Sequence, residues 1–596
     1  MRWFALLFAF QQALWIDVPF TRQEKNGCGS ASIWMVMKYW KPDTPVDVDD
    51  LQQQLYSKDA GGIYAKDMVR YFESHGYRAF AFRGDWSDLE NHISKGRPLI
   101  VCLEQNSRGV LLHYVVVAGI DDAQDLVLLN DPAQRKLLAM PRAEFEQRWR
   151  STDNWTLLAV PEIDLASTAF RDEKLGEARE HLASALRTDP EDRFTNDFLG
   201  SVFFLQDKTE AALKYWNRAG KPAIENIRID PPLRINPALL DRGFAFSRGN
   251  VLELSDFEDT EARLSALGVF SRYRMELTPA ESGRFDVTFR AAERNGPNSL
   301  SLLSWASGLP FETVRPEVSN IGGKAVNLDA LIRWDSNKRR AFAALDSPLR
   351  GDPKWGVRLT FDARDENWAS SDAGFHMRKF ETAAQLKAVP SGRWQWMSGA
   401  AVSKRTFSNT SAGGVELKYA GSVKRTILRD PVRDMRIDSS VGTEAGKLFG
   451  STPLRFVKFE NKTSFHWRSA SVQTRAGTIV GQMPFDERFV IGLERDSDLW
   501  LRAHSATLDG QKNASNTSRA YIVMNSDFQK TVFNSGWFQI KTGPFLDTGK
   551  SSISPRWIAD SGLEMRFSVL GSIAINISYG WSLRDGQREL FARAGP

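Results

Sequence analysis

Residues 18–40 read VPFTRQEKNGCGSASIWMVMKYW and include Cys28, one of only two cysteines in a chain of 596 residues. The thiol stands directly before an apolar run with helical spacing, so the sequence predicts that it lies at the N-terminus of a helix. At that position the helix dipole favours the thiolate over the thiol. Gln23 lies five residues upstream, close enough for its side-chain amide to point at the same oxygen atom as the backbone N–H of Cys28. The stretch therefore predicts a cysteine nucleophile with two donors for an oxyanion.

A histidine and an aspartate follow on two apolar segments further along the chain. His113 opens HYVVVAGI, and Asp131 lies near the end of LLNDP at 128–132. Both segments read as neighbouring strands, so we expect the imidazole and the carboxylate to lie side by side. A cysteine nucleophile needs such an imidazole to take and return a proton, and a group that fixes the imidazole tautomer. Taken singly, a cysteine before an apolar helix is more often a core residue and a histidine at a strand start is usually solvated.

These segments, in this order, resemble the papain-like cysteine peptidases of the bacteriocin-processing type, which act on double-glycine leaders. The resemblance covers residues 16–161 and implies an α+β papain-like peptidase domain that hydrolyses peptide bonds. It implies Cys28 as the nucleophile, His113 as the base, Asp131 as the residue that orients the imidazole, and Gln23 in the oxyanion hole. Members of the family often carry proline after the Cys-Gly pair, where this chain has Ser30, and the chain lacks the transporter modules to which leader peptidases are commonly fused.

Two further features of this part of the chain are the N-terminal segment and the second cysteine. Residues 1–15 read MRWFALLFAFQQALW, in which Arg2 precedes an apolar stretch. This is the layout of a secretory signal peptide and is too short to span a bilayer as a helix. The alternative is an apolar first strand or helix of the mature fold. Cys102 lies in the apolar run PLIVCLE and is expected to be a buried core residue, so a disulfide framework is excluded.

Charge and the remaining histidines limit the classes of partner. The chain has 78 basic and 73 acidic residues, a net charge of +5, without a basic block, so nucleic acid is not an expected partner. The other histidines show no ligand spacing, and nucleotide and flavin signatures are absent, so neither a metal nor a cofactor is expected. These histidines are His75, His92, His181, His376, His466 and His504.

Residues 166–222 are helical throughout and repeat a pattern of small and apolar side chains. Ala178 and Leu182 recur as Ala212 and Trp216 after 34 residues. This is the period of tetratricopeptide repeats, in which small residues let paired helices approach closely. The segment therefore predicts a short all-α, tetratricopeptide-like pair.

Beyond this pair the pattern turns to strands. Residues 224–295 give the order strand, helix, helix, strand, strand, and residues 298–596 alternate apolar and polar side chains. Val357, Leu359, Phe361 and Ala363 face one way, whereas Arg358, Thr360, Asp362 and Arg364 face the other. The last strand is expected to alternate in the same way from Ile573 to Trp581. At roughly nineteen residues per strand and turn, the segment would make about sixteen strands, the size of an outer-membrane β-barrel; a soluble sandwich or propeller would show the same alternation.

Residues 224–295 resemble a polypeptide-transport-associated (POTRA) domain, and residues 298–596 resemble the barrels of the outer-membrane assembly-factor and surface-antigen superfamily. The residues that carry the resemblance are PFDERFVIG, the LWLRAH that follows, FLDTG around Asp547, and GSIAINISYGWSL. In that superfamily an Arg-Gly-aromatic tip sits on an inward-folded loop. Here Arg502 matches the arginine, while Ala503 and His504 replace the glycine and the aromatic residue.

Taken together, the sequence predicts a bacterial outer-membrane protein with a periplasmic cysteine peptidase domain. Helical repeats and a POTRA-like domain would join this domain to a transmembrane β-barrel. Its expected partners are a polypeptide substrate, outer-membrane lipid, and a secreted or assembled client protein. Two alternatives stay open: a non-enzymatic polypeptide-recruiting assembly or secretion factor with a degenerate peptidase domain, and a soluble periplasmic peptidase with an interaction sandwich.

Overall fold

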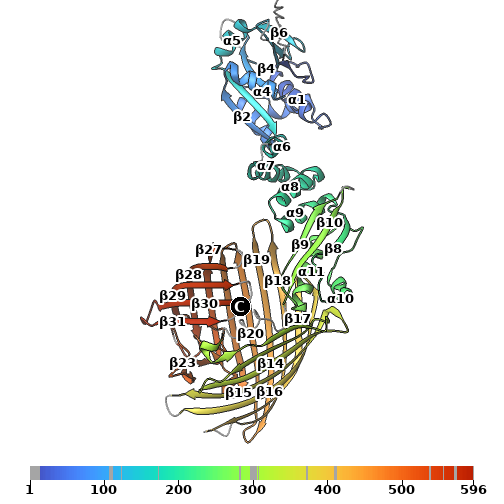
Figure 1. The fold of residues 1–596 in the computed structure, drawn as a ribbon. Helices are drawn as coiled ribbons and strands as arrows, with labels where there is room; N and C mark the ends of the chain where they lie inside the picture. The colour runs from blue at the N-terminus through green and yellow to red at the C-terminus, as the bar shows by residue number, and fades with distance from the viewer. Residues whose placement is uncertain are drawn as a thin grey trace, which may run out of the picture. The chain divides into compact units, whose positions relative to one another are not determined.

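The computed structural model describes residues 14–105, 112–121, 124–171, 174–280, 283–294, 305, 308–370, 374–408, 413–535, 538–554, 556–569 and 573–594. The chain divides into two compact units, Met1–Asp207 and Lys208–Pro596, which are shown in Figure 1. The predicted signal peptide lies outside the described residues except for β1 (Leu14–Trp15). No helix among the described residues is long and apolar enough to cross a membrane.

The first unit is built on one antiparallel sheet with helices on both faces. Its strand order is β2 (Tyr77–Arg83), β7 (Trp155–Pro161), β3 (Leu99–Glu104), β4 (Leu112–Asp121), β5 (Leu126–Asn130) and β6 (Leu138–Pro141), and β1 pairs with β4. The helices of this domain are α1 (Cys28–Trp40), α2 (Val48–Leu55), α3 (Ala65–Ser74), α4 (Trp86–Ser94) and α5 (Arg142–Arg150). The predicted α+β domain is confirmed.

Alternating side chains of the central strands enter two separate cores. Ile100 of β3 joins the cluster formed by α1 to α3, which includes Met37 and Phe72. Its neighbour Val101 points to the opposite face and joins the cluster of α4 and α5, which includes Trp149. Strands that are buried on both faces read as continuous apolar runs, which is why PLIVCLE and HYVVVAGI are recognisable in the sequence. Cys102 is 4% exposed, as expected.

The helices that follow fall in both units. α6 (Glu162–Arg171), α7 (Leu175–Thr188) and α8 (Arg193–Leu205) belong to the first unit, and α9 (Thr209–Trp216) belongs to the second. The small and apolar positions of the 34-residue pattern are buried in α7 and in α9. The boundary between the units therefore falls inside the stretch that the sequence predicts as one helical module.

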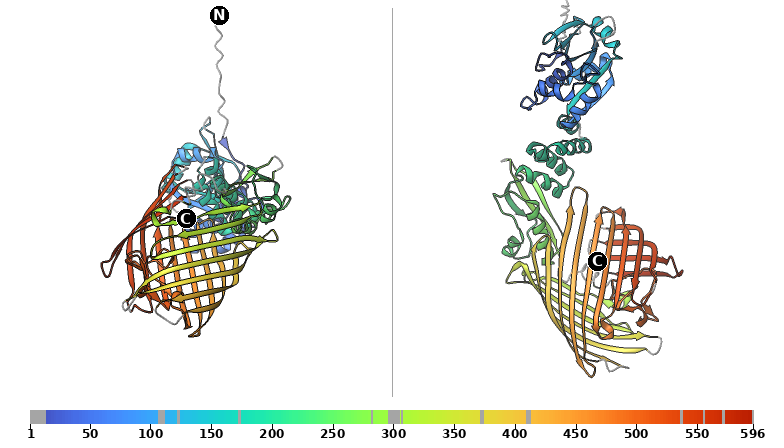
Figure 2. Two further views of the ribbon diagram at one scale, coloured as in Figure 1. Left: turned by 60° about the horizontal axis from the view of Figure 1, so that its bottom comes forward. Right: turned by 180° about the vertical axis from the view of Figure 1, so that it is seen from behind.

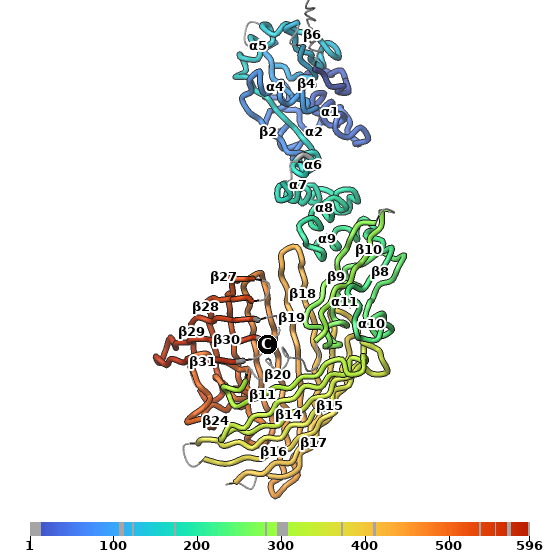
Figure 3. Tube along the Cα trace, in the orientation of Figure 1, coloured from blue at the N-terminus to red at the C-terminus, as the bar shows by residue number. Residues whose placement is uncertain are grey.

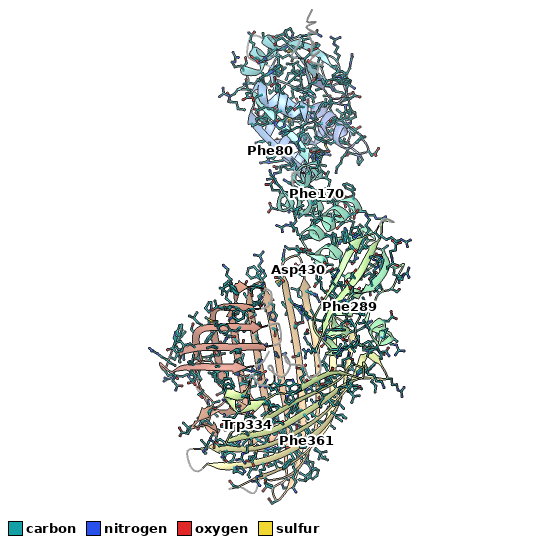
Figure 4. All side chains as sticks on the ribbon, viewed as in Figure 1. Phe80, Phe170, Phe289, Trp334, Phe361 and Asp430 are labelled. Carbon is teal, nitrogen blue, oxygen red and sulfur yellow. The ribbon has the colours of Figure 1, made fainter. Side chains whose placement is uncertain are left out.

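After α9, the second unit continues with the predicted order of strand, helix, helix, strand, strand. The elements are β8 (Ile224–Ile229), α10 (Pro237–Gly243), α11 (Leu254–Leu267), β9 (Phe270–Pro279) and β10 (Phe285–Glu293). β10 lies in the centre of the sheet, parallel to β8 and antiparallel to β9. Phe289 of β10, labelled in Figure 4, is fully buried and makes edge contacts with Phe244 and Phe270 at 5.5 Å.

A large antiparallel sheet forms the remainder of the second unit, and Figure 3 traces its strands in chain order. They are β11 (Thr313–Val314), β12 (Glu317–Ile321), β13 (Val326–Arg333), β14 (Lys338–Leu349), β15 (Asp352–Ala369), β16 (Phe375–Ser391), β17 (Trp394–Phe407), β18 (Gly414–Asp430), β19 (Met435–Gly450), β20 (Leu454–Trp467), β21 (Ala470–Gln482), β26 (Ala520–Phe528), β27 (Lys530–Asn534), β28 (Phe538–Ser551), β29 (Ile558–Val569), β30 (Ile573–Ser582) and β31 (Arg588–Ala594).

Since β11 and β12 both pair with β13, and β26 and β27 both pair with β28, these 17 segments make 15 consecutive strands, close to the sixteen expected. The sheet curls round on itself in the views of Figure 2. Among the described residues it runs from β11 to β31 without a pairing that joins its two ends.

The predicted alternation is present, with the apolar side chains outermost. Leu359 and Phe361 are 46% and 42% exposed. Asp362, which follows Phe361 and points the other way, is half-buried and forms an ion pair with Arg340 at 2.9 Å. The prediction of the last strand is wrong in one respect. The alternating segment that ends at Trp581 is β30, and a further strand, β31, pairs with it across a short turn. Three of the seven residues in its sequence RELFARA are charged, so its apolar period is too weak to be seen in the sequence.

The loop between β21 and β26, residues 483–519, covers the polar face of this sheet, and we call it the inner segment. It holds η3 (Phe485–Glu487), β22 (Phe489–Val490), β23 (Thr507–Leu508), β24 (Gln511–Asn513), η4 (Ala514–Asn516) and β25 (Thr517–Ser518). Buried ion pairs join the inner segment to strands that precede it in the chain. Arg405 of β17 pairs with Asp486 at 2.8 Å, and Glu366 of β15 pairs with Lys512 at 2.7 Å.

The turn between β18 and β19 reaches the helices that precede the sheet. Arg429 forms ion pairs with Glu210 of α9 and, at 2.7 Å, with Glu261 of α11. Asp430, labelled in Figure 4, pairs with Lys214 of α9 at 3.0 Å. α9 and the β8 to β10 domain are thus fastened to the sheet by charged contacts.

Candidate active site

Cys28 is the first residue of α1, as the sequence predicts. The chain turns into the helix through Asn26, which has a positive φ of 60°, and through the buried Gly27. The backbone N–H of Cys28 is one of the first four of the helix, which have no partner within it. No described residue accepts a hydrogen bond from this N–H. The half-buried thiol therefore stands beside a backbone donor that is free to bind an anion.

His113 and Asp131 are brought together by β4 and β5, which pair antiparallel. His113 lies near the start of β4, and Asp131 directly follows β5. Their side chains are 4% and 5% exposed, and His113 Nε2 lies 2.7 Å from Asp131 Oδ1. A carboxylate only accepts hydrogen bonds, so Nε2 carries the proton that is donated to Asp131. The other ring nitrogen, Nδ1, is therefore the one left to act on the Cys28 thiol, which lies close enough to raise the pKa of His113.

Opposing effects set the pKa of His113. Burial by itself lowers the pKa of this imidazole, but hydrogen bonds to Asp131 and Cys28, together with their charges, raise it overall to about 9. At Asp131 the effects are reversed. Burial by itself raises the pKa of this carboxyl group, but the contact with His113 and hydrogen bonds from Ala133 and Gln134 bring the pKa below its usual value. The imidazole is therefore held as a cation between two groups that favour its charge.

Gln23 is joined to the same region through its backbone. Its N–H donates to the carbonyl oxygen of Pro132 at 3.0 Å, which ties the segment before Cys28 to the loop that carries Asp131. The side-chain Oε1 of Gln23 is buried and has no hydrogen-bond partner among the described residues. All four residues that the sequence singles out thus lie on segments that meet at the N-terminus of α1.

Sequence reasoning missed the polar side chains that surround this set. Gln134 Nε2 donates to Asp131 Oδ2 at 2.7 Å and so fixes the second carboxylate oxygen. The Ser30 hydroxyl lies 2.9 Å from the carbonyl oxygen of Gly27 and 3.0 Å from Gln52 Oε1. The only sequence signal for these contacts is the serine that follows Cys28 and Gly29, since Gln52 belongs to a separate helix and Gln134 to a loop.

A second polar centre lies in the other unit, around Arg502 of the inner segment. Its guanidinium pairs with Asp547 of β28 and with Asp527 of β26, both at 2.7 Å, and with Glu564 of β29. Arg502 and Asp547 both stand in the segments on which the second resemblance rests. His504 lies between two carboxylates that no motif identified, Asp560 at 2.9 Å and Asp585 at 3.0 Å. The described residues contain no group of three or more His, Cys, Asp or Glu side chains that could hold a metal ion.

Three solved structures are similar to more than half of this chain at low sequence identity. Among solved structures, BamA from Haemophilus ducreyi lacking POTRA domains 1–3 is 10% identical, with a TM-score of 0.37 over 63% of this chain and 85% of that one. CdiB from Escherichia coli is 14% identical, with a TM-score of 0.42 over 63% and 76%. CdiB from Acinetobacter baumannii is 13% identical, with a TM-score of 0.39 over 73% and 86%. No curated protein matches the chain.

The family comparison concerns the unit that holds Cys28, His113 and Asp131. The matching segment begins within β1 and ends within β7, so it includes β2 to β6 in full and only parts of β1 and β7. The first domain of the chain is similar to the Peptidase_C39 like family, whose model matches residues 15–156.

Proposed function

We propose that this protein is an outer-membrane-anchored cysteine peptidase whose first domain hydrolyses peptide bonds in the periplasm. The observation that carries the proposal is the buried His113, which contacts Asp131 through Nε2 and lies close enough to Cys28 for the thiol to raise the pKa of His113. A thiol, an imidazole and a carboxylate in series, at the start of a helix, form the arrangement that cysteine nucleophiles require. The match to the Peptidase_C39 like family supports the same chemistry.

The proposed reaction has two steps. The Cys28 thiolate attacks the carbonyl carbon of the scissile peptide bond, and the oxyanion that forms is bound by the Cys28 N–H and by the side-chain amide of Gln23. The C–N bond breaks as His113 gives its proton to the leaving amine, which leaves a thioester on Cys28. Water then attacks the thioester while His113 takes a proton from it, and the carboxylic acid and the free thiol are released.

The second unit supports the proposed location in the outer membrane. Its sheet exposes side chains that a soluble domain would bury, among them Leu359, Tyr419 and Leu563. Charged side chains such as Arg405 and Glu366 lie on the opposite face, where the inner segment pairs with them. An apolar outer face with a polar interior is the pattern of a transmembrane β-barrel. In this proposal α6 to α9 act as the tetratricopeptide-like module, the β8 to β10 domain is POTRA-like, and a client polypeptide handled by the barrel is the substrate.

Two measurements test the proposal. The purified full chain in detergent is incubated with a peptide library, and cleavage that disappears in Cys28→Ala is the expected result. Membrane fractionation should recover the chain with the outer membrane. A chain that binds polypeptides at the same sites but cleaves none would instead be the non-enzymatic recruiting factor, and recovery in the soluble periplasm would exclude the barrel.

A further inference from the structure

Ser30 is a buried hydroxyl next to the nucleophile that the proposed reaction does not use. It is the third residue of α1 and is fully buried. Its single hydrogen is shared between two acceptors, the Gly27 carbonyl oxygen at 2.9 Å and Gln52 Oε1 at 3.0 Å. Gln52 is held in this orientation because its Nε2 donates to the carbonyl of Asn26. The hydroxyl thus lies against the turn that leads into α1.

The Gly27 carbonyl and the Cys28 N–H belong to the same peptide unit. This unit is planar and trans, so the carbonyl oxygen and the amide hydrogen point in opposite directions. A group that fixes the direction of the Gly27 carbonyl therefore also fixes the direction of the Cys28 N–H. The carbonyl receives two hydrogen bonds, from Ala31 N–H at 3.0 Å and from Ser30. Both polarise the peptide unit and make its N–H a stronger donor.

The turn has little room to adopt another orientation. A Cβ atom on Gly27 would lie 3.3 Å from both the Ser30 hydroxyl oxygen and the Glu24 carbonyl oxygen, so the peptide is enclosed on these two sides. The Gly27 N–H donates to Glu24 at 3.0 Å, which closes the turn. In most helices a carbonyl oxygen accepts one hydrogen bond, from the N–H four residues later. Here the Gly27 carbonyl oxygen also accepts from the Ser30 hydroxyl, and this additional donor distinguishes the start of α1.

We propose that Ser30 is a positioning residue that aims the Cys28 N–H at the oxyanion of the acyl-transfer step. This inference rests on the proposed function, because it assumes that Cys28 carries out acyl transfer. It predicts that Ser30 affects reactions that develop an oxyanion at Cys28 and does not affect the nucleophilicity of the thiolate, which depends on His113 and Asp131.

Two reagents separate these effects in the full-length protein. p-Nitrophenyl acetate acylates Cys28 through an oxyanion, whereas iodoacetamide alkylates the same thiolate by displacement without one. Rates are measured at Cys28, with Cys28→Ala subtracted as background. Ser30→Ala should lower the acylation rate about tenfold, less than the loss of an entire oxyanion donor, and leave the alkylation rate within twofold of the wild type.

Two variants serve as controls. Ser32→Ala removes another fully buried hydroxyl of α1, which donates to the Tyr114 carbonyl at 3.4 Å, and should change neither rate. Gln52→Ala removes the competing acceptor and leaves the Ser30 hydrogen to Gly27, so acylation should be unchanged or faster. Ser30→Thr keeps the donor and should restore acylation towards the wild-type rate.

The outcomes also distinguish this inference from the proposed function. If Ser30→Ala slows both reagents equally, or slows neither, the positioning role is wrong. A loss in Gln52→Ala as large as that in Ser30→Ala would likewise overturn it, because the pair would then act only as a structural clamp. Wild-type protein in which acylation of Cys28 depends on Ser30, but which cleaves no peptide, would refute the peptidase and leave the inference intact.

Discussion

At Cys28 the local backbone and the distant side chains make separate contributions to reactivity. The helix start supplies a free N–H and a favourable dipole, whereas His113 and Asp131 supply the proton transfer. Cys28→Ala should therefore abolish peptide cleavage while the thermal unfolding profile and membrane location stay those of the wild type. Cleavage by the alanine variant at the wild-type rate would refute the nucleophile assignment.

The second cysteine offers a matched control for thiol chemistry. Cys102 is buried in β3, and burial raises the pKa of its thiol to about 12, so it is not a thiolate at neutral pH. Cys102→Ser should keep cleavage activity within about twofold and lower stability by roughly 1 to 3 kcal/mol, because a hydroxyl replaces a thiol in an apolar strand. Initial cleavage rates and chemical denaturation measure the two effects, and loss of activity in the folded variant would contradict this division of roles.

His113 and Asp131 should differ in the size of their effects. His113→Ala removes the only described imidazole in contact with Cys28, so the acylation rate should fall by roughly a hundredfold or more. Asp131→Asn keeps a hydrogen-bond acceptor near Nε2 and should lower turnover less, with substrate binding nearly unchanged. Single-turnover kinetics separate the two quantities, and a larger loss in Asp131→Asn than in His113→Ala would contradict the proposed roles.

The pH dependence of cleavage reports the charge of His113. The pKa of His113 is raised to about 9, so the imidazolium should persist up to that pH and lose its proton above it. Asp131→Asn removes the negative charge that raises this pKa, so the alkaline limb of the pH–rate profile should move to lower pH. An unchanged alkaline limb in the asparagine variant would show that another group titrates there.

Three of the residues that sequence reasoning identified share one property: each has a chemical type that is rare or costly at its position. Cys28, His113 and Asp131 stand beside apolar segments whose period predicts where their side chains point. Ser30 and Gln134 could not be recognised in this way, because serine and glutamine are common and their partners are a carbonyl group and one carboxylate oxygen. Only the three-dimensional approach of two segments gives these side chains a role.

At the scale of elements, the alternation of β30 makes a test with adjacent residues possible. Ile575 is 38% exposed on the apolar face, whereas Asn576 lies on the polar face opposite Arg566 and Arg593. Ile575→Glu should cost about 1 to 2 kcal/mol, somewhat less than the cost of a basic residue facing lipid, and Asn576→Glu should cost little because its charge meets two arginines. Heat-modifiable electrophoretic mobility of the folded chain compares the two variants. Equal assembly of both would favour a soluble sandwich.

The alternation of side chains along a strand could be predicted from the sequence, but the strands and segments that pack against it could not. Alternation correctly separated the faces of β15 and β30, while β31, with three charged residues out of seven, and the route of the inner segment were missed. Arg502 was identified from a motif, but Asp527 and Glu564 were not, because they come from separate strands. Such partners depend on register across the sheet, which is set by many pairs at once.

At the scale of the whole molecule, the second unit depends on charged contacts between its helices and its sheet. Arg429→Ala should break the ion pairs with Glu210 and Glu261 and leave two carboxylates facing each other. Amide hydrogen exchange in α9 should therefore become at least tenfold faster. Arg468→Ala, in the turn that follows β20, removes an arginine that stacks on Trp467 and should leave α9 unaffected. Equal exchange in both variants would show that apolar packing alone holds α9.

The inner segment also constrains the order in which the sheet can assemble. Its charged side chains pair with strands that precede it in the chain, such as β15 and β17, and Arg502 pairs with β26, β28 and β29, which follow it. The part of this polar interior around Arg502 therefore lacks its carboxylate partners until the C-terminal strands exist. A buried charge without its partner costs several kcal/mol, so the segment cannot be enclosed by the early strands alone. The last strands must therefore pair with the sheet and enclose the charged inner segment together, so that completion of the sheet and burial of the inner segment are one cooperative event.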